Sequence, residues 1–277
     1  MTVAGSNPVS PTVAIVDYGM GNRRSVEKAF AHVGAQPLLT RDHAAIRAAD
    51  GVVVPGVGSF SRAMGNLREL GLDDVIGERA ASGVPVLGIC LGMQLLFESS
   101  VEGGDCAGLG LLRGDVRPLA AGGLRVPHIG WNVVRFARAS RLTAALPQEV
   151  AFYHVHSYVA HPADADDVLG SAEYGERFAS AVARENVYGV QFHPEKSSLL
   201  GLRLLASFSA ACHERAPAAR RDWQDPRERV ASVRPSGART QGGGNSGAIA
   251  PTEDAASAQR RTPPDAAGVL PIPPNAA

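Results

Sequence analysis

The chain carries Gly88-Ile89-Cys90-Leu91-Gly92 between an apolar run at residues 84–87 and a helix-like segment at residues 93–98. In a nucleophile elbow, glycines on either side of the nucleophile leave room for a strained turn from strand to helix. Here the tip would be Cys90, at the amino end of a helix whose partial positive charge favours the thiolate. The pattern predicts a nucleophilic cysteine; the plainer alternative is a structural cysteine buried after a core strand.

A candidate base for this thiol lies far downstream, in the run VYGVQFHPEKS at residues 187–197. Side chains two residues apart on an extended segment point to the same face, so His193 and Glu195 could both meet Cys90. The imidazole would take the thiol proton and later donate one to a leaving amine, while the carboxylate would hold the ring in a useful tautomer. The sequence thus predicts a Cys/His/Glu triad, against the alternative of a surface histidine at a strand end.

A glycine-rich turn follows the apolar run at residues 51–54. Glycines there allow backbone N–H groups to turn toward a ligand oxygen, and acyl transfer needs such donors where negative charge develops. The candidate oxyanion hole therefore comprises the amides of Leu91, Val57 and Gly58. A dinucleotide loop is the competing interpretation, but the third glycine of that fingerprint is absent here and after Gly19-Met20-Gly21.

In this chain order, the three elements resemble the class I (triad) glutamine amidotransferases, which hydrolyse the side-chain amide of glutamine to supply ammonia. Further motifs narrow the resemblance to the glutaminase subunits of imidazole glycerol phosphate synthase, over residues 13–213. The most discriminating are DYGMGN at residues 17–22 and PEKS at 194–197, because the elbow and triad are common to the whole class. The other matching motifs are PGVG at 55–58, PHIGWN at 127–132 and HSY at 156–158.

The resemblance implies a cytoplasmic enzyme of histidine biosynthesis that acts in a heterodimer with a (β/α)8-barrel cyclase. Cys90 would attack glutamine to give a glutamyl thioester and ammonia, and water would then release glutamate. The partner would use the ammonia to form imidazole glycerol phosphate and aminoimidazole carboxamide ribotide. A closed interface is expected because free ammonia becomes non-nucleophilic ammonium in neutral water. No cofactor is implied.

The resemblance also assigns residues outside the triad. Those expected to bind glutamine are Gly56, Gln94, His156, Ser157 and Tyr158. Those expected at the partner interface are Asn22, Trp131 and Lys196. Each has a plainer alternative: Gln94 could point to solvent, Asn22 could cap a helix, Trp131 could belong to the core, and Lys196 could be a solvated charge.

Composition fits this assignment. The chain has 277 residues, is 45% hydrophobic, and balances 27 basic against 27 acidic residues, so neither a nucleic-acid nor an anionic-membrane partner is indicated. Its three cysteines, Cys90, Cys106 and Cys212, lack close pair spacing, and the first residues lack a signal-peptide pattern. These features favour a reducing cytoplasm and predict neither disulfides nor a metal site.

Short apolar strands alternate with helical patterns, which predicts an α/β fold with a mixed, mostly parallel sheet flanked by helices. We expect a flexible segment at residues 1–12, an amidotransferase domain at 13–214 and a disordered tail rich in Pro, Gly, Ala and Arg at 215–277. The predicted strands are 13–17, 36–40, 51–54, 84–89, 125–136, 150–159, 168–174, 178–184 and 187–192, and the predicted helices are 22–33, 60–69, 72–82, 91–98 and 199–212.

Three other functions remain open at this point. The chain could be the glutaminase of a different synthase, such as the one that makes pyridoxal phosphate, although the DYGMGN and PEKS motifs argue against it. A related elbow occurs in cysteine hydrolases and chaperones of the same broad fold. The chain could also be a scaffold subunit with a silent triad.

Overall fold

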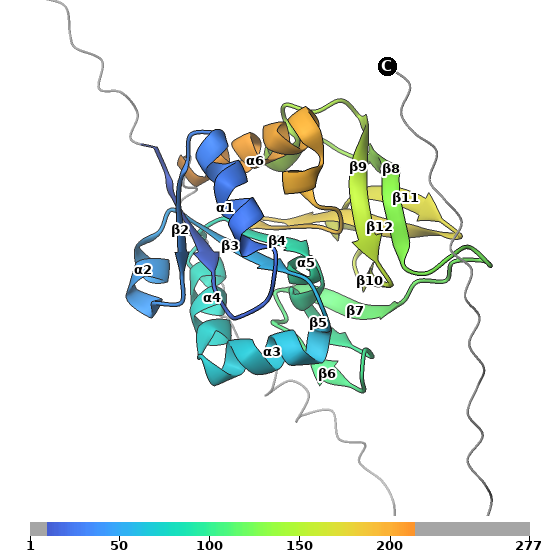
Figure 1. Ribbon diagram of the computed structural model, residues 1–277, viewed down its shortest axis with the longest axis horizontal. Coiled ribbons are helices and arrows are strands. Elements are labelled where there is room, and N and C mark those ends of the chain that lie inside the picture. Colours follow the sequence, from blue (N-terminus) through green and yellow to red (C-terminus); the bar gives the residue numbers. More distant parts are fainter. Residues whose placement is uncertain (1–9, 214–277) are drawn as a thin grey trace, which may run out of the picture. The chain divides into compact units, whose positions relative to one another are not determined.

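The computed structural model describes residues 10–213 of the chain (Figure 1). A nine-stranded sheet, in the order β2-β1-β3-β4-β13-β12-β11-β8-β9, runs through this part. Its strands are β1 (Thr12–Val16), β2 (Gln36–Thr40), β3 (Gly51–Gly56), β4 (Val86–Cys90), β8 (His128–Phe136), β9 (Glu149–His156), β11 (Val168–Tyr174), β12 (Glu176–Arg184) and β13 (Val187–Val190).

The sheet has a parallel and an antiparallel half. The strands from β2 to β13 pair in parallel, and those from β13 to β9 pair antiparallel. Strands β3 and β4 are buried along their whole length, as expected for short apolar strands that are covered on both faces. The predicted mixed α/β fold is confirmed.

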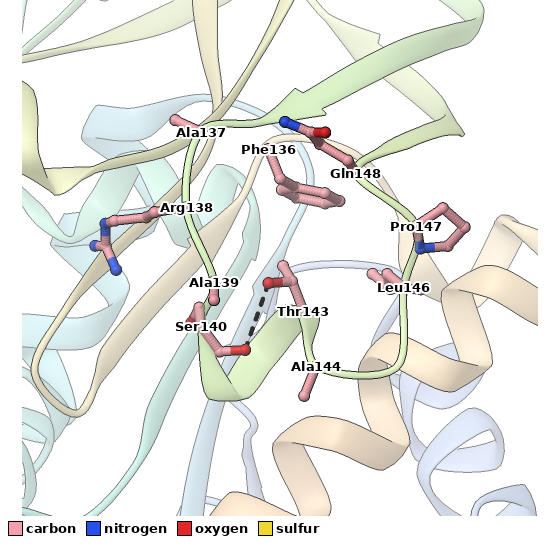
Figure 2. A pocket seen from close by; sticks show the side chains of 10 residues that line it. All are labelled: Phe136, Ala137, Arg138, Ala139, Ser140, Thr143, Ala144, Leu146, Pro147 and Gln148. Atoms are coloured by element: carbon pink, nitrogen blue, oxygen red, sulfur yellow. Dashed lines mark hydrogen bonds between the residues drawn. The ribbon is translucent and has the colours of Figure 1, made fainter.

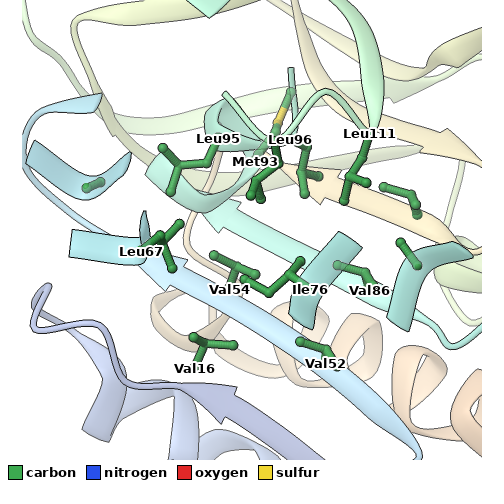
Figure 3. Close-up of a cluster of buried hydrophobic side chains, with 14 of the residues drawn as sticks. Val16, Val52, Val54, Leu67, Ile76, Val86, Met93, Leu95, Leu96 and Leu111 are labelled. Carbon is green, nitrogen blue, oxygen red and sulfur yellow. The ribbon is translucent and has the colours of Figure 1, made fainter. Parts of the chain in front are cut away.

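Helices cover both faces of the parallel half (Figure 1). Successive side chains of β3 point to opposite faces of the sheet. Val53 therefore packs in a hydrophobic cluster on one face, and Val52 and Val54 pack in a second cluster on the other face. Figure 3 shows the second of these clusters, in which Leu67 and Ile76 lie close to the β3 valines. Helices α1 (Arg23–His32) and α6 (Ser198–His213) lie on one face, and α3 (Phe60–Glu69) and α4 (Leu72–Ala81) lie on the other.

The predicted helix over residues 91–98 is too long. Helix α5 (Leu91–Leu95) ends after little more than one turn, and the chain continues as β5 (Phe97–Ser100). This strand belongs to a second sheet of order β10-β7-β5-β6, with β6 (Cys106–Ala107), β7 (Leu112–Pro118) and β10 (Tyr158–Pro162). Tertiary pairing overrides the local helical pattern, because parallel pairing with β7 satisfies the backbone of β5.

Two further segments differ from the sequence-based expectation. The predicted strand 150–159 is split at Ser157 into β9 and β10, which belong to different sheets. A short helix, α2 (His43–Ala48), was not predicted; it begins where the Asp42 carboxylate accepts a hydrogen bond from the Ala45 amide at 2.7 Å. The predicted disordered tail lies outside the described residues, as does nearly all of the predicted flexible N-terminal segment.

The topology brings three chain segments to one edge of the sheet. Strands β3, β4 and β13 are neighbours and parallel, so their carboxyl ends lie together, where ligands bind in open α/β sheets. Gly56 at the end of β3 is in register with Cys90 at the end of β4. Within residues 10–213, no helix has the length and apolar character needed to cross a bilayer.

Candidate active site

Cys90 occupies a strained backbone position at the junction of β4 and α5. Its φ of 56° and ψ of −112° place it in a region that residues with a side chain rarely adopt. The turn is possible because the flanking positions are glycines: a Cβ on Gly92 would lie 1.7 Å from the Val54 carbonyl oxygen, and one on Gly88 would lie 2.5 Å from the Gly92 oxygen. The structure thus has the geometry of a nucleophile elbow at Cys90.

His193 and Glu195 meet beside this cysteine, although not on an extended strand as the sequence predicts. Strand β13 ends at Val190, and Pro194 opens a short 3-10 helix, Pro194–Lys196. Within this turn, His193 Nδ1 donates to Glu195 Oε1 at 2.8 Å, and both side chains are almost completely buried. Proline fits the first position of such a turn because it needs no amide partner there.

The environment of His193 sets its proton affinity. Burial on its own would lower the pKa of His193, but hydrogen bonds with Cys90 and Glu195, together with the negative charges of these groups, raise it above the ordinary histidine value. A ring that holds a proton between a sulfur and a carboxylate can return that proton to a leaving group.

A cavity of about 370 Å³ opens above the cysteine. The predicted oxyanion residues Val57, Gly58 and Leu91 all line it, next to Cys90 and His193. Of the predicted glutamine-binding residues, Gln94, His156, Ser157 and Tyr158 also line it. Gly56 does not; it is buried at the end of β3, where a Cβ would come 2.4 Å from the Tyr18 hydroxyl oxygen.

Gln94 is buried and does not point to solvent. Its Nε2 donates to the Tyr158 carbonyl oxygen at 3.0 Å and to Gln191 Oε1 at 2.9 Å. Gln191 in turn places its Nε2 3.8 Å from Cys90 Sγ. Gln191 belongs to the motif at residues 187–197, from which no role was predicted for it; its place two residues before His193 was the available signal.

Asn22 is partly exposed and contacts the triad directly. Its side-chain amide donates to Glu195 Oε1, and it makes no capping hydrogen bond to helix α1, although it holds the N-cap position with a φ of 71°. In the described part of the chain, Glu195 Oε2 has no hydrogen-bond partner, so Asn22 and His193 supply the contacts of this carboxylate. Sequence reasoning missed this role because the two residues lie 173 positions apart.

For the glutamine hydrolysis that the sequence predicts, Asn22→Gly is expected to lower kcat of the isolated chain between about tenfold and a hundredfold, because Glu195 loses a donor that fixes its orientation. Glycine accepts the left-handed backbone of this position, so the unfolding midpoint should change little. Steady-state glutaminase assays and denaturant unfolding would measure both effects. If Asn22 served only the partner interface, the isolated variant would retain the wild-type kcat.

The other two predicted interface residues are exposed. Trp131 is 55% exposed and contacts only the edge of the Tyr153 ring among the aromatic residues described, which excludes the alternative that it belongs to the core. Lys196 is exposed at the mouth of the cavity. Both therefore lie where a partner could reach them.

A second hollow, of about 320 Å³, lies between residues 136 and 148 (Figure 2). Two of its polar side chains are engaged: Arg138 donates to the Ala183 carbonyl at 2.7 Å, and Thr143 donates to the Ser140 carbonyl at 3.4 Å. It does not include any residue of the triad. We assign it no chemistry. Among the described residues, no group of His, Cys, Asp and Glu could hold a metal ion.

Comparison with known proteins gives consistent matches. The family model for glutamine amidotransferase class-I matches residues 14–210. The imidazole glycerol phosphate synthase subunit HisH of Moorella thermoacetica is 53% identical over 196 residues, which are 71% of this chain and 93% of that protein. The subunit of the same name from Lactococcus lactis is 45% identical over 197 residues, 71% of this chain and 96% of that protein.

Solved structures support the fold. A glutamine amidotransferase crystal structure aligns with a TM-score of 0.56 at 21% identity and covers 72% of this chain and 98% of that one. A chain of PurLQS from Thermotoga maritima aligns with a TM-score of 0.57 at 19% identity, covering 74% of this chain and 99% of that one. At these identities, the likeness extends to the fold alone.

Proposed function

We infer the roles of the site residues from the family to which the chain belongs, the class-I glutamine amidotransferases and, within it, the HisH subunits of imidazole glycerol phosphate synthase. The protein is the glutaminase subunit of that synthase and acts in histidine biosynthesis. One observation carries the assignment of roles: Cys90 and His193, from two distant segments, line the same cavity, which is large enough for a small ligand, and Glu195 bonds to His193 from behind.

In the first half of the proposed reaction, Cys90 Sγ attacks the side-chain carbonyl carbon of glutamine. A carbon–sulfur bond forms, and the negative charge on the oxygen is stabilised by the amides of Leu91 and of the 57–58 loop. His193 then donates its proton to the amide nitrogen, the carbon–nitrogen bond breaks, and ammonia leaves. Glu195, held by Asn22, keeps the imidazole correctly oriented throughout.

In the second half, water hydrolyses the glutamyl thioester. His193 takes a proton from the water, whose oxygen attacks the thioester carbon, and the carbon–sulfur bond breaks to release glutamate. The wall formed by His156, Ser157 and Tyr158, together with Gln94, would hold the substrate. We place this chemistry in the cytoplasm, since a catalytic thiol persists in a reducing compartment.

The chain is a subunit of a complex, and we propose that its partner is a (β/α)8-barrel cyclase that covers the cavity. One face of β8 exposes Ile129, Trp131 and Val133, which are 59%, 55% and 40% exposed. Their cross-strand neighbours on β9 include Tyr153 and Val155, and Val155 lines the cavity. A contiguous apolar face of this kind is typical of a protein interface, and closing it over the cavity would keep ammonia away from bulk water.

Trp131→Ala is expected to raise the Kd for the cyclase between about 30-fold and 1000-fold, because a central aromatic side chain commonly contributes 2–4 kcal/mol to such an interface. Titration calorimetry with the purified cyclase would measure the change. Arg135→Ala on the same strand is the matched control; Arg135 forms an exposed ion pair with Glu149, and its loss should change Kd less than about fivefold. An unchanged Kd for Trp131→Ala would place the interface elsewhere.

The assigned function is tested by glutamate release from glutamine, measured for the full chain alone and with the cyclase subunit and its ribulosyl substrate. We expect strong stimulation by the loaded cyclase and formation of imidazole glycerol phosphate from glutamine. A rate of glutamate release that does not change when the cyclase is added would support the glutaminase chemistry but contradict the proposed partner. No release under any condition would overturn the proposed role of the triad.

A further inference from the structure

A chain of hydrogen bonds runs from strand β8 to the wall of the cavity. Asn132 Nδ2 lies 3.4 Å from His128 Nε2, His128 Nδ1 lies 3.0 Å from His156 Nε2, and His156 Nδ1 lies 3.0 Å from the Tyr158 carbonyl oxygen. Both histidines are buried. His156 and Tyr158 line the cavity, whereas His128 and Asn132 do not.

The contacts fix the tautomer of each ring. A carbonyl oxygen only accepts, so His156 Nδ1 carries a hydrogen and, in a neutral ring, Nε2 carries the lone pair. His128 must then donate to that lone pair through Nδ1, which leaves its own Nε2 to accept from the Asn132 amide. Every bond in the series therefore points in one direction, from Asn132 to Tyr158.

A second proton on His156 would set two N–H groups against each other, either across the 3.0 Å gap to His128 or, if His128 changed tautomer, across the 3.4 Å gap to Asn132. The surroundings also oppose that proton: burial, followed by the nearby His128 ring, lowers the pKa of His156 to about 3. Burial likewise lowers the pKa of His128, whose ring stacks on Tyr174 and His154. Both rings are thus neutral donors and acceptors.

The Tyr158 carbonyl at the end of this series also accepts a hydrogen bond from the Gln94 amide. Gln94 donates in turn to Gln191, whose own amide lies beside the Cys90 sulfur. The same oxygen atom therefore joins the two histidines to the residues beside the nucleophile. A shift of the Tyr158 peptide would move the cavity wall and release one of the contacts that hold the Gln94 amide.

We propose that His128 is a positioning residue for the glutamine pocket: its Nδ1–H holds His156 in the tautomer that anchors the Tyr158 carbonyl, and thereby fixes the wall at residues 156–158. This proposal rests on the assigned glutaminase function. His128 itself touches neither the nucleophile nor the cavity, so it acts only through His156.

The chain offers a matched control in the same cluster. His154 is buried and stacks on His128 with ring centroids 5.2 Å apart. Its nitrogens bond to the Phe152 carbonyl and to Ser180 Oγ, at 3.0 and 2.9 Å, and therefore not to the series that ends at Tyr158. A role that was only structural would affect variants of His128 and His154 alike.

His128→Phe keeps an aromatic ring against Tyr174 but removes the donor. We expect the KM for glutamine to rise about tenfold, because a factor of that size corresponds to the free energy that one hydrogen bond contributes. The kcat should change less than about threefold. His128→Asn, whose amide can donate near the position of Nδ1, should recover most of the wild-type KM. His154→Phe should leave KM unchanged. An unchanged KM in H128F, or an equal rise in H154F, would overturn the proposal.

Nitrogen-15 NMR of the labelled full chain tests the tautomers without any substrate. At neutral pH, His128 and His156 should both carry the hydrogen on Nδ1, and His156 should lose this preference in H128F. Observation of the Nε2–H tautomer of His156 in the wild type overturns the proposal even if H128F does not fold. If the tautomers are those derived above but neither the wild type nor any variant releases glutamate, the assigned function is wrong. The proposed series of hydrogen bonds would still be correct in that case.

Discussion

Cys90→Ala is expected to lower kcat for glutamate release by about 10⁴-fold or more, because no other described group in the cavity can form the thioester. Cys90→Ser should be nearly as inactive, since a hydroxyl is a much weaker nucleophile than a thiol that exchanges its proton with His193. Glutamate release measured with the cyclase present would quantify both losses.

Two controls separate loss of the nucleophile from loss of the fold. Cys106→Ala alters a cysteine on β6 that does not line the cavity, so it should retain wild-type turnover. Glutamine protection against alkylation should be confined to Cys90, and mass spectrometry of iodoacetamide-treated protein would locate it. A Cys90→Ser variant as active as the wild type would contradict the assignment of Cys90 as nucleophile.

Gly92→Ala is expected to lower the free energy of unfolding by more than about 4 kcal/mol, or to prevent folding, because the new Cβ would lie 1.7 Å from the Val54 carbonyl oxygen. Strand β3 cannot move aside, since it is paired on one edge with β1 and on the other with β4. The denaturation midpoint and yield of soluble variant would report the effect.

Gly65→Ala provides the matched control. Gly65 lies in helix α3, and a Cβ there would meet no atom within 4 Å. Because alanine favours the helix more than glycine does, this substitution should stabilise the protein by about 0.5–1 kcal/mol. A Gly92→Ala variant that unfolds at the wild-type midpoint would show that the elbow tolerates a side chain after all.

Features that depend on local backbone requirements could be inferred from the residues alone. The sharp turn after β4 requires the glycines of the elbow. Burial on both faces of the sheet requires the apolar runs of β3 and β4. Each pattern is contained in a few consecutive residues, even though the contact that requires Gly92 is with Val54 on another strand, so the fold class and the elbow at Cys90 could be predicted without coordinates.

Contacts between distant side chains could be found only once the chain was folded in three dimensions. It set Asn22 against Glu195, exposed Trp131 on β8 and directed His128 toward His156. It also ended helix α5 at Leu95 so that β5 could pair with β7. Such contacts depend on strand order and on the loops between strands, because a residue's own neighbours along the chain carry no record of a partner that is distant in the sequence.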